Sequence, residues 1–255
     1  LTAAFCGATL LTLFQALGLD PFGLRAPLAA ADQMRYVSTL GNINFYSSYV
    51  SVILPFILIQ WSFAVGWRRW LYGTAIVLCA GGTLFTGSES FALAFIICLL
   101  VPPVFLFGKP WAMKRFCIGL LFLLAAMEGV LQLSRLLPTQ ALSVSFSLRL
   151  MLSPAIFCGL VALCLVGWLI ANKIGPESPR RFRKRYLCML ALLLICAGTF
   201  LVLANTVFID FSFGSADRFL KLNGDWGTDR GRIWRFCLEQ FRGFDLLHQL
   251  FGGGP

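Results

Sequence analysis

The chain has 255 residues, of which 58% are hydrophobic and only 13% are charged. A soluble domain has about 45–50% apolar and about 25% charged residues, so this chain has too little charge to cover one globular core of its length. Its mean hydropathy of +0.81 indicates that lipid covers much of its surface. Eight of the nine cysteines lie in or beside apolar runs. Cysteines in that setting behave as small hydrophobes, which argues against a disulfide scaffold, and no Cys/His spacing predicts a metal site.

Seven apolar stretches predict membrane-spanning helices, each of which needs about 20 mostly apolar residues. They cover residues 1–19, 45–67, 70–85, 91–108, 116–133, 150–171 and 186–208. Between the third and fourth lies Thr86-Gly87-Ser88-Glu89-Ser90, which favours two short helices over one long helix. The predicted fold is all-α: a polytopic transmembrane helical bundle over residues 1–208, followed by the start of a large loop over residues 209–255. Because the chain begins inside an apolar run and ends in a glycine-rich stretch, we expect a fragment cut at both ends.

Basic residues are distributed unevenly over the loops between these stretches. Successive loops lie on alternate sides of the membrane. The loops of one side carry eleven basic residues, and the short loops of the other side carry four. Because cytoplasmic loops carry an excess of Lys and Arg, the richer set is predicted to be cytoplasmic. Residues 209–255 then lie outside, which in a Gram-negative cell is the periplasm. The net charge of +10 does not predict nucleic-acid binding, since its largest cluster, residues 173–185, is a short loop between two membrane helices.

The outer segment is predicted to contain an amphipathic helix, which Thr228 or Asp229 can cap and Gly243 can end. On a helical wheel its side chains separate into two groups. The apolar arc consists of Ile233, Trp234, Cys237, Leu238, Phe241 and Phe244, and the charged stripe consists of Arg232, Arg235, Glu239 and Arg242. Arg230 falls within the apolar arc, where an arginine needs an anionic partner. That partner is either a lipid-linked diphosphate, which the guanidinium fork can bind through two hydrogen bonds, or Asp225 or Asp229.

Polar residues at the ends of predicted spans allow two interpretations. Asn42 and Asn44 either orient a glycan or pyrophosphate near the membrane surface, or form a turn and helix cap. Glu89 either acts as a base or holds an arginine, or it is a carboxylate favoured by the dipole at a helix N-terminus.

Two further ionisable residues are candidates for a functional role. Glu128 lies inside the fifth span near its outer end, where it is a functional group in the membrane, a carboxylate that snorkels to the interface, or a partner of Arg135 or Arg149. His248 is the only histidine, and it is either catalytic or an ordinary surface residue of a loop.

Three segments, in order, resemble the O-antigen ligase and O-antigen polymerase superfamily. Gly41-Asn42-Ile43-Asn44 is similar to the family's Gly-Asn-x-Asn entry to a membrane helix, and Thr86-Gly87-Ser88-Glu89 is similar to its Thr-Gly-Ser-Arg turn. Arg230-Gly231-Arg232-Ile233-Trp234, followed by Phe251-Gly252-Gly253-Gly254, is similar to its Arg-x-x-x-Trp helix and Phe-Gly-x-Gly loop. Two positions depart from the pattern. Glu89 replaces the usual Arg, and His248 precedes the glycine motif, whereas the family's essential His lies later in the large loop.

The resemblance implies a glycosyltransferase-type enzyme of lipopolysaccharide or polysaccharide biosynthesis in the cell envelope. Such an enzyme moves a glycan from a polyprenyl diphosphate to a lipid or glycan acceptor. Arginines can neutralise the leaving diphosphate without a metal or another cofactor. The implied substrate-binding residues are Arg230, Arg232, Arg218, Lys221, Asn42, Asn44 and Glu89, and the catalytic His is expected to lie outside this fragment. The motifs do not separate a ligase from a polymerase. A transporter or flippase of lipid-linked glycans, or a noncatalytic membrane scaffold, are the alternatives.

Overall fold

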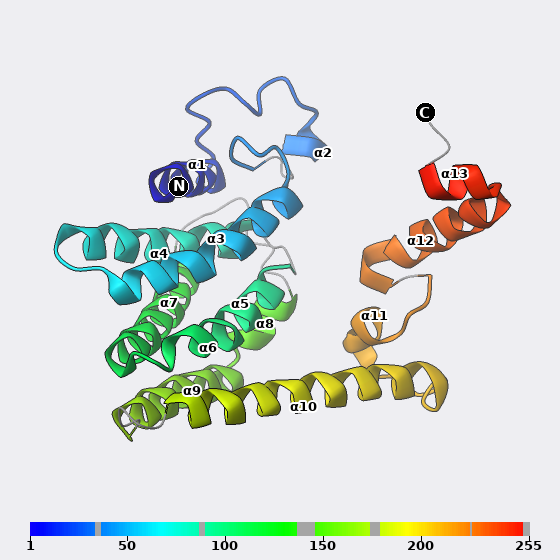
Figure 1. Ribbon diagram of the computed structural model, residues 1–255. Coiled ribbons are helices and arrows are strands. Elements are labelled where there is room, and N and C mark those ends of the chain that lie inside the picture. The colour runs from blue at the N-terminus through cyan, green and yellow to red at the C-terminus, as the bar shows by residue number, and fades with distance from the viewer. Residues whose placement is uncertain (34–36, 87–89, 137–145, 174–178, 225, 252–255) are drawn as a thin grey trace. The chain divides into compact units, whose positions relative to one another are not determined.

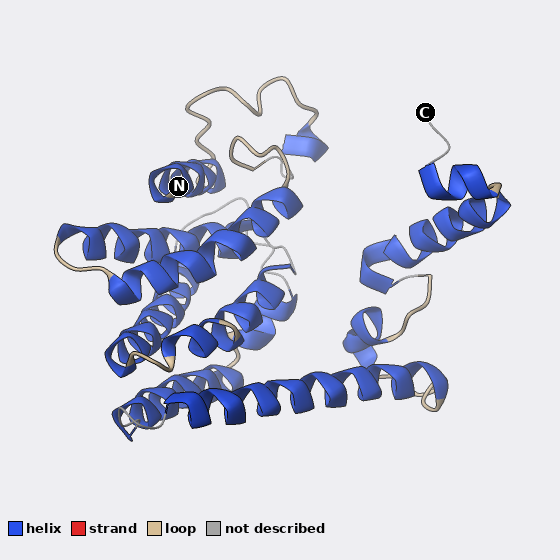
Figure 2. Cartoon of the chain, viewed as in Figure 1, coloured by secondary structure: helices blue, strands red, loops and turns tan. Residues whose placement is uncertain are grey.

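The computed structural model describes residues 1–33, 37–86, 90–136, 146–173, 179–224 and 226–251. All regular structure within these ranges is helical, and none of it is strand (Figure 2). This confirms the predicted all-α fold. The chain divides into two compact units, Leu1–Tyr186 and Leu187–Pro255, and the division falls within the last predicted span.

The helices are labelled in Figure 1, and each predicted apolar stretch is largely helical. Those of the first unit are α1 (Thr2–Ala16), α2 (Ala30–Gln33), α3 (Ile43–Phe63), α4 (Trp67–Thr86), α5 (Ser90–Leu100), α6 (Pro102–Leu106), α7 (Pro110–Leu136), α8 (Phe146–Met151) and α9 (Pro154–Lys173). Helix α10 (Pro179–Thr206) belongs mainly to the second unit, which continues with η1 (Gly214–Ala216), α11 (Asp217–Leu220), α12 (Trp226–Gly243) and α13 (Leu246–Phe251).

Four of the helices, α3, α7, α9 and α10, are long and apolar enough to cross a membrane. The chain is a helical membrane protein. The other three predicted spans are also helical, but α1 has only 15 residues and α4 begins with the polar sequence Trp67-Arg68-Arg69. The fourth span is divided between α5 and α6, because Pro102 and Pro103 lack the backbone N–H that a continuous helix requires. Seven crossings therefore stay a prediction.

The first unit has a buried core between closely packed helices. Helix α3 packs against α4, α5 and α7, while α7 also packs against α4 and α9. Glycines permit this close approach: a Cβ on Gly119 would lie 2.9 Å from Cε3 of Trp61, and a Cβ on Gly82 would overlap the Tyr46 hydroxyl. Lipid supplies no hydrophobic force between membrane helices, so their association depends on close van der Waals packing. Small residues permit that close packing.

Basic and aromatic side chains interleave where α3 ends and where α4 and α7 begin. Four cations lie over aromatic rings there: Arg68 over Trp67 at 6.0 Å, Arg69 over Trp61 at 4.9 Å, Lys109 over Phe63 at 4.8 Å and Arg115 over Trp111 at 5.1 Å. Such aromatic residues are typical of the boundary between membrane and water. The fold thus brings together two basic loops that the sequence assigns to the same side.

Candidate functional site

Asn42 begins α3 as its N-terminal cap. Its side-chain oxygen accepts a hydrogen bond from the backbone N–H of Asn44 at 2.7 Å. Gly41 precedes it with a φ of 73°, a conformation that glycine adopts without steric cost. The geometry matches the turn-and-cap interpretation, because the cap satisfies an N–H that has no partner within the helix. A role for Asn42 or Asn44 in binding glycan stays a prediction.

Several candidates lie outside what the structure describes. Glu89 is one, and so is the glycine-rich end of the third motif. The side chains of Arg218 and Asp229 are also undescribed, as is Asp225. The predicted roles of Glu89 and Arg218 therefore stay predictions, as does the alternative that an aspartate pairs with Arg230.

Glu128 takes part in a short chain of polar contacts on α7. The Gln132 amide donates to the Glu128 carboxylate at 2.5 Å, and Arg135 donates to the Gln132 carbonyl oxygen at 3.1 Å. The predicted pairing with Arg135 is thus indirect, through Gln132.

His248 lies in the short helix α13, and its exposed ring contacts the carboxylate of Asp245 three residues earlier. Asp245 also accepts the backbone N–H of His248 at 2.9 Å. His248 thus lies in a helix and not in the predicted loop, and both interpretations of its role stay predictions.

Lys221 has a role that the sequence did not indicate. Its side chain is only 8% exposed, and its ammonium donates to the main-chain carbonyl oxygens of Ala204 at 2.9 Å, Phe208, and Ile209 at 3.0 Å. The Ala204 carbonyl lies in the last turn of α10, where a helix leaves carbonyls without intrahelical partners and carries partial negative charge, and the other two lie just after the helix ends at Thr206. Lys221 therefore caps α10 and joins the residues that follow to the end of the helix, using its three N–H donors. Its predicted contribution to substrate binding remains untested.

Asn205 joins the same end of α10 to the segment that follows. Its amide donates to the Leu220 carbonyl oxygen at 2.7 Å and accepts the backbone N–H of Leu222 at 2.6 Å. The Trp226 indole donates to the Phe219 carbonyl oxygen at 3.0 Å, so the start of α12 is attached to the same turn. An asparagine in the last turn of an apolar helix was the signal available in the sequence, but its partners are 15 and 17 residues away.

Asp217 stabilises the turn that contains these residues. Its carboxylate accepts the backbone N–H of Phe213 at 2.9 Å and the hydroxyl of Ser212 at 2.7 Å. These two hydrogen bonds, the one from Phe213 first, hold the pKa of the Asp217 carboxyl below its ordinary value because they favour the charged form.

Helix α12 confirms the predicted amphipathic helix, but it begins at Trp226, so Thr228 and Asp229 lie inside the helix and do not cap it as predicted. Every side chain of the apolar arc is exposed, and so are those of the charged stripe, including Arg232. Gly231 lies where a Cβ would overlap the Asn223 carbonyl oxygen. Arg230 is exposed within the apolar arc and makes no hydrogen bond or ion pair with another described residue.

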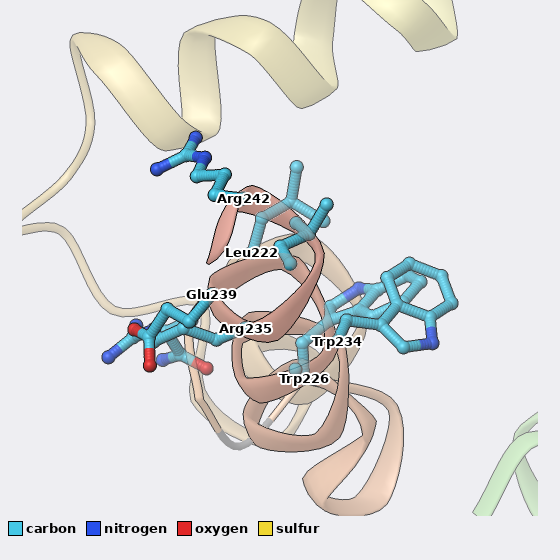
Figure 3. Close-up of a pocket in the computed structure, with 9 residues that line it drawn as sticks. Leu222, Trp226, Trp234, Arg235, Glu239 and Arg242 are labelled. Atoms are coloured by element: carbon cyan, nitrogen blue, oxygen red, sulfur yellow. The ribbon is translucent and has the colours of Figure 1, made fainter. Parts of the chain in front are cut away.

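A groove of about 350 Å³ follows α12 between the apolar arc and the charged stripe. Figure 3 shows the Trp226 and Trp234 indoles on one side of the helix and the Arg235 and Glu239 side chains on the other. The two indole rings are 4.9 Å apart. Arg230 does not line the groove. Helix α12 thus presents guanidinium groups in two places: Arg230 within the apolar arc, and Arg235 along the groove.

A buried polar network in the first unit was not predicted. The Gln15 side-chain oxygen accepts the backbone N–H of Ser38 at 2.6 Å, and the Tyr46 hydroxyl lies 3.2 Å from that of Thr9. Ser38 has a φ of 59°, which is uncommon for a residue other than glycine. The sequence pattern that could have indicated it is Thr9, Thr12 and Gln15, which are spaced three residues apart within an apolar run. This spacing places polar side chains at neighbouring positions on one helix face.

No protein-family model, curated protein or solved structure matches the chain. The resemblance to O-antigen ligases and polymerases therefore rests on the three short motifs alone.

Proposed function

We propose that this chain is part of a bacterial inner-membrane glycan transferase of the O-antigen ligase or polymerase type, with α12 on the periplasmic side. One observation carries the proposal. Arg230 is exposed within the apolar arc of α12, four positions before Trp234. The family's Arg-x-x-x-Trp helix has the same spacing.

The chemistry requires charge stabilisation at the leaving group. The acceptor hydroxyl forms a bond to the anomeric carbon of the glycan, and the bond from that carbon to the diphosphate oxygen breaks. The electron pair leaves on the lipid diphosphate, and the hydroxyl proton goes to a base, which the resemblance implies is a histidine of the large loop. Arg230 donates two charge-assisted hydrogen bonds to the diphosphate.

The test compares arginines in the two places on α12. Transfer from a lipid-linked donor is measured with membranes that contain the full-length protein, and the membrane level of each variant is measured alongside. We expect Arg230→Ala and Arg230→Lys each to lower the transfer rate by about 100-fold, since Lys cannot reproduce a bidentate contact. Arg235→Ala is the matched control on the charged stripe, and we expect a smaller effect because an exposed charge contributes little.

Two results would contradict this assignment. Near-normal transfer by Arg230→Lys would show that no bidentate clamp exists at this position. A larger loss with Arg235→Ala would move the diphosphate site to the groove.

The orientation is tested by labelling with a membrane-impermeant thiol reagent. A cysteine at Glu239, on the charged stripe, should react from the periplasm, and a cysteine at Arg181 should react only after the membrane is opened, because the basic loops are predicted to be cytoplasmic. The reverse pattern would contradict the proposed orientation.

A further inference from the structure

We infer that α12 lies flat on the surface of the bilayer that α10 spans, with its apolar arc at the boundary of the acyl chains and its charged stripe in water. The partner of this helix face is an anionic phospholipid surface. This inference stands whether or not the protein transfers glycans.

The composition of α12 suits a membrane surface and not a membrane crossing. Its 18 residues include four arginines and two acidic residues, and charges are costly in the hydrocarbon core. Yet the whole apolar arc is exposed, with Ile233 59% and Leu238 57% accessible. A helix with one strongly charged face, one apolar face and low net hydrophobicity is typical of the interface.

The length of α10 places the start of α12 near the membrane boundary. Residues 186–206 form its apolar part, which at about 1.5 Å per residue is about 30 Å long, equal to the hydrocarbon thickness of a typical bilayer. The helix therefore reaches the boundary near Thr206. Lys221 and Asn205 attach the following turn to that end, and the Trp226 indole attaches the first residue of α12 to the same turn. Helix α12 thus begins where α10 leaves the lipid.

Aromatic side chains mark the same region. After the end of α10, the ring of Phe211 lies 5.0 Å from that of Phe213, and the Phe213 ring lies 5.7 Å from that of Phe200 in the last two turns of α10. On α12, the indole rings of Trp226 and Trp234 form a second aromatic pair. Tryptophan is enriched at the level of lipid headgroups, where its ring meets lipid and its N–H meets polar groups.

Charge decides between lipid and protein as the covering surface. The arginines of α12 exceed its acidic residues by two, which complements an anionic lipid surface. Arg230 lies within the apolar arc, so a protein covering the arc would bury a guanidinium and would have to supply an anion for it. A lipid phosphate provides that anion without burying the charge.

The test measures the depth of two faces of α12 with nitroxide spin labels. The full chain is placed in vesicles of phosphatidylglycerol and phosphatidylcholine, with the other cysteines replaced by alanine. One protein carries a single label at Cys237 on the apolar arc. The matched control carries Cys237→Ala and Glu239→Cys, so that its single label lies on the charged stripe. We expect the label at Cys237 to collide with dissolved oxygen and to be shielded from a water-soluble nickel chelate. The label at position 239 should show the reverse.

Other patterns would overturn the inference. Collision of both labels with the nickel chelate would place the apolar arc in water. Shielding of the Cys237 label from both reagents would show that protein covers the arc. Unmodified protein provides a second measurement, because a phospholipid with a photoreactive acyl chain should form adducts on Ile233, Trp234 or Phe241. Adducts confined to the membrane-spanning helices would contradict the docking of α12.

Discussion

Helices α7 and α10 are both long and apolar, yet they differ in how many of their residues are buried. In the most apolar part of each helix, 39% of the residues are buried in α7 but only 6% in α10. Gly119 in α7 lies against Trp61, whereas a Cβ on Gly198 in α10 would meet nothing within 4 Å. An apolar helix face gains little free energy when it exchanges lipid for protein, because lipid tails are equally apolar. The difference therefore teaches that shape, and not hydropathy, determines which membrane helices pack.

The second unit uses polar contacts where the first uses apolar packing. Lys221 and Asn205 attach the turn after α10 through hydrogen bonds to main-chain groups. In the first unit, by contrast, α7 contributes fully buried side chains such as Leu123 and Met127 to a continuous apolar cluster. Substitutions in the two regions should therefore differ in size and in how far their effects extend.

The largest expected effect separates the two long helices. Leu123→Ala in α7 removes a fully buried side chain and should lower the free energy of unfolding by about 2–5 kcal/mol. Leu194→Ala in α10 is the matched control, with its side chain 70% exposed, and should change it little. Unfolding with SDS in lipid–detergent micelles measures both. Equal destabilisation by the two variants would show that protein, and not lipid, covers α10.

The next effect should be confined to the second unit. Lys221→Met leaves the carbonyl oxygens of Ala204, Phe208 and Ile209 without this donor and should cost about 1–3 kcal/mol. Hydrogen exchange should therefore accelerate at the end of α10 and in the following turn, with the first unit unchanged. Lys184→Met, an exposed lysine in the first turns of α10, is the control. Unchanged exchange in the Lys221 variant would remove the proposed cap.

A pair of glycines sharpens the contrast in packing. Gly119→Ala brings a Cβ to 2.9 Å from Trp61 and should destabilise the protein by about 1–3 kcal/mol. Gly198→Ala meets nothing within 4 Å and should instead stabilise α10 by about 0.5–1 kcal/mol, because alanine favours helix. The same SDS unfolding experiment compares them. A stabilising Gly119→Ala would mean that α3 and α7 are not closely packed.

The smallest effect concerns the cap of α3. Asn42→Ala should cost about 1 kcal/mol, and Asn42→Ser should restore most of it, because a serine hydroxyl also accepts the capping N–H. Thermal unfolding measures the stability, and the transfer assay measures activity alongside. If Asn42→Ser is as stable as the native protein but loses transfer, the amide binds substrate in addition to capping the helix.

The sequence by itself determined the features that depend on neighbouring residues. Hydropathy over about 20 residues identified the four helices that are long and apolar enough to cross a membrane, and the helical wheel from Arg230 to Phe244 separated two faces of α12. The helix cap was one of the two interpretations of Asn42, since the capping hydrogen bond joins residues two positions apart. These predictions succeeded because the interactions lie within one element.

The tertiary structure alone decided which faces are covered and what the buried polar groups contact. Lys221 was predicted only as a basic residue near substrate, because its acceptors are 12 to 17 residues away and become neighbours only when the chain turns back on α10. The contact between Gln15 and Ser38 spans 23 residues, and the partner of Gly119 is Trp61 on another helix. Composition carries no information on such pairings, since their free energy depends on the shape of two surfaces that meet only in the folded chain.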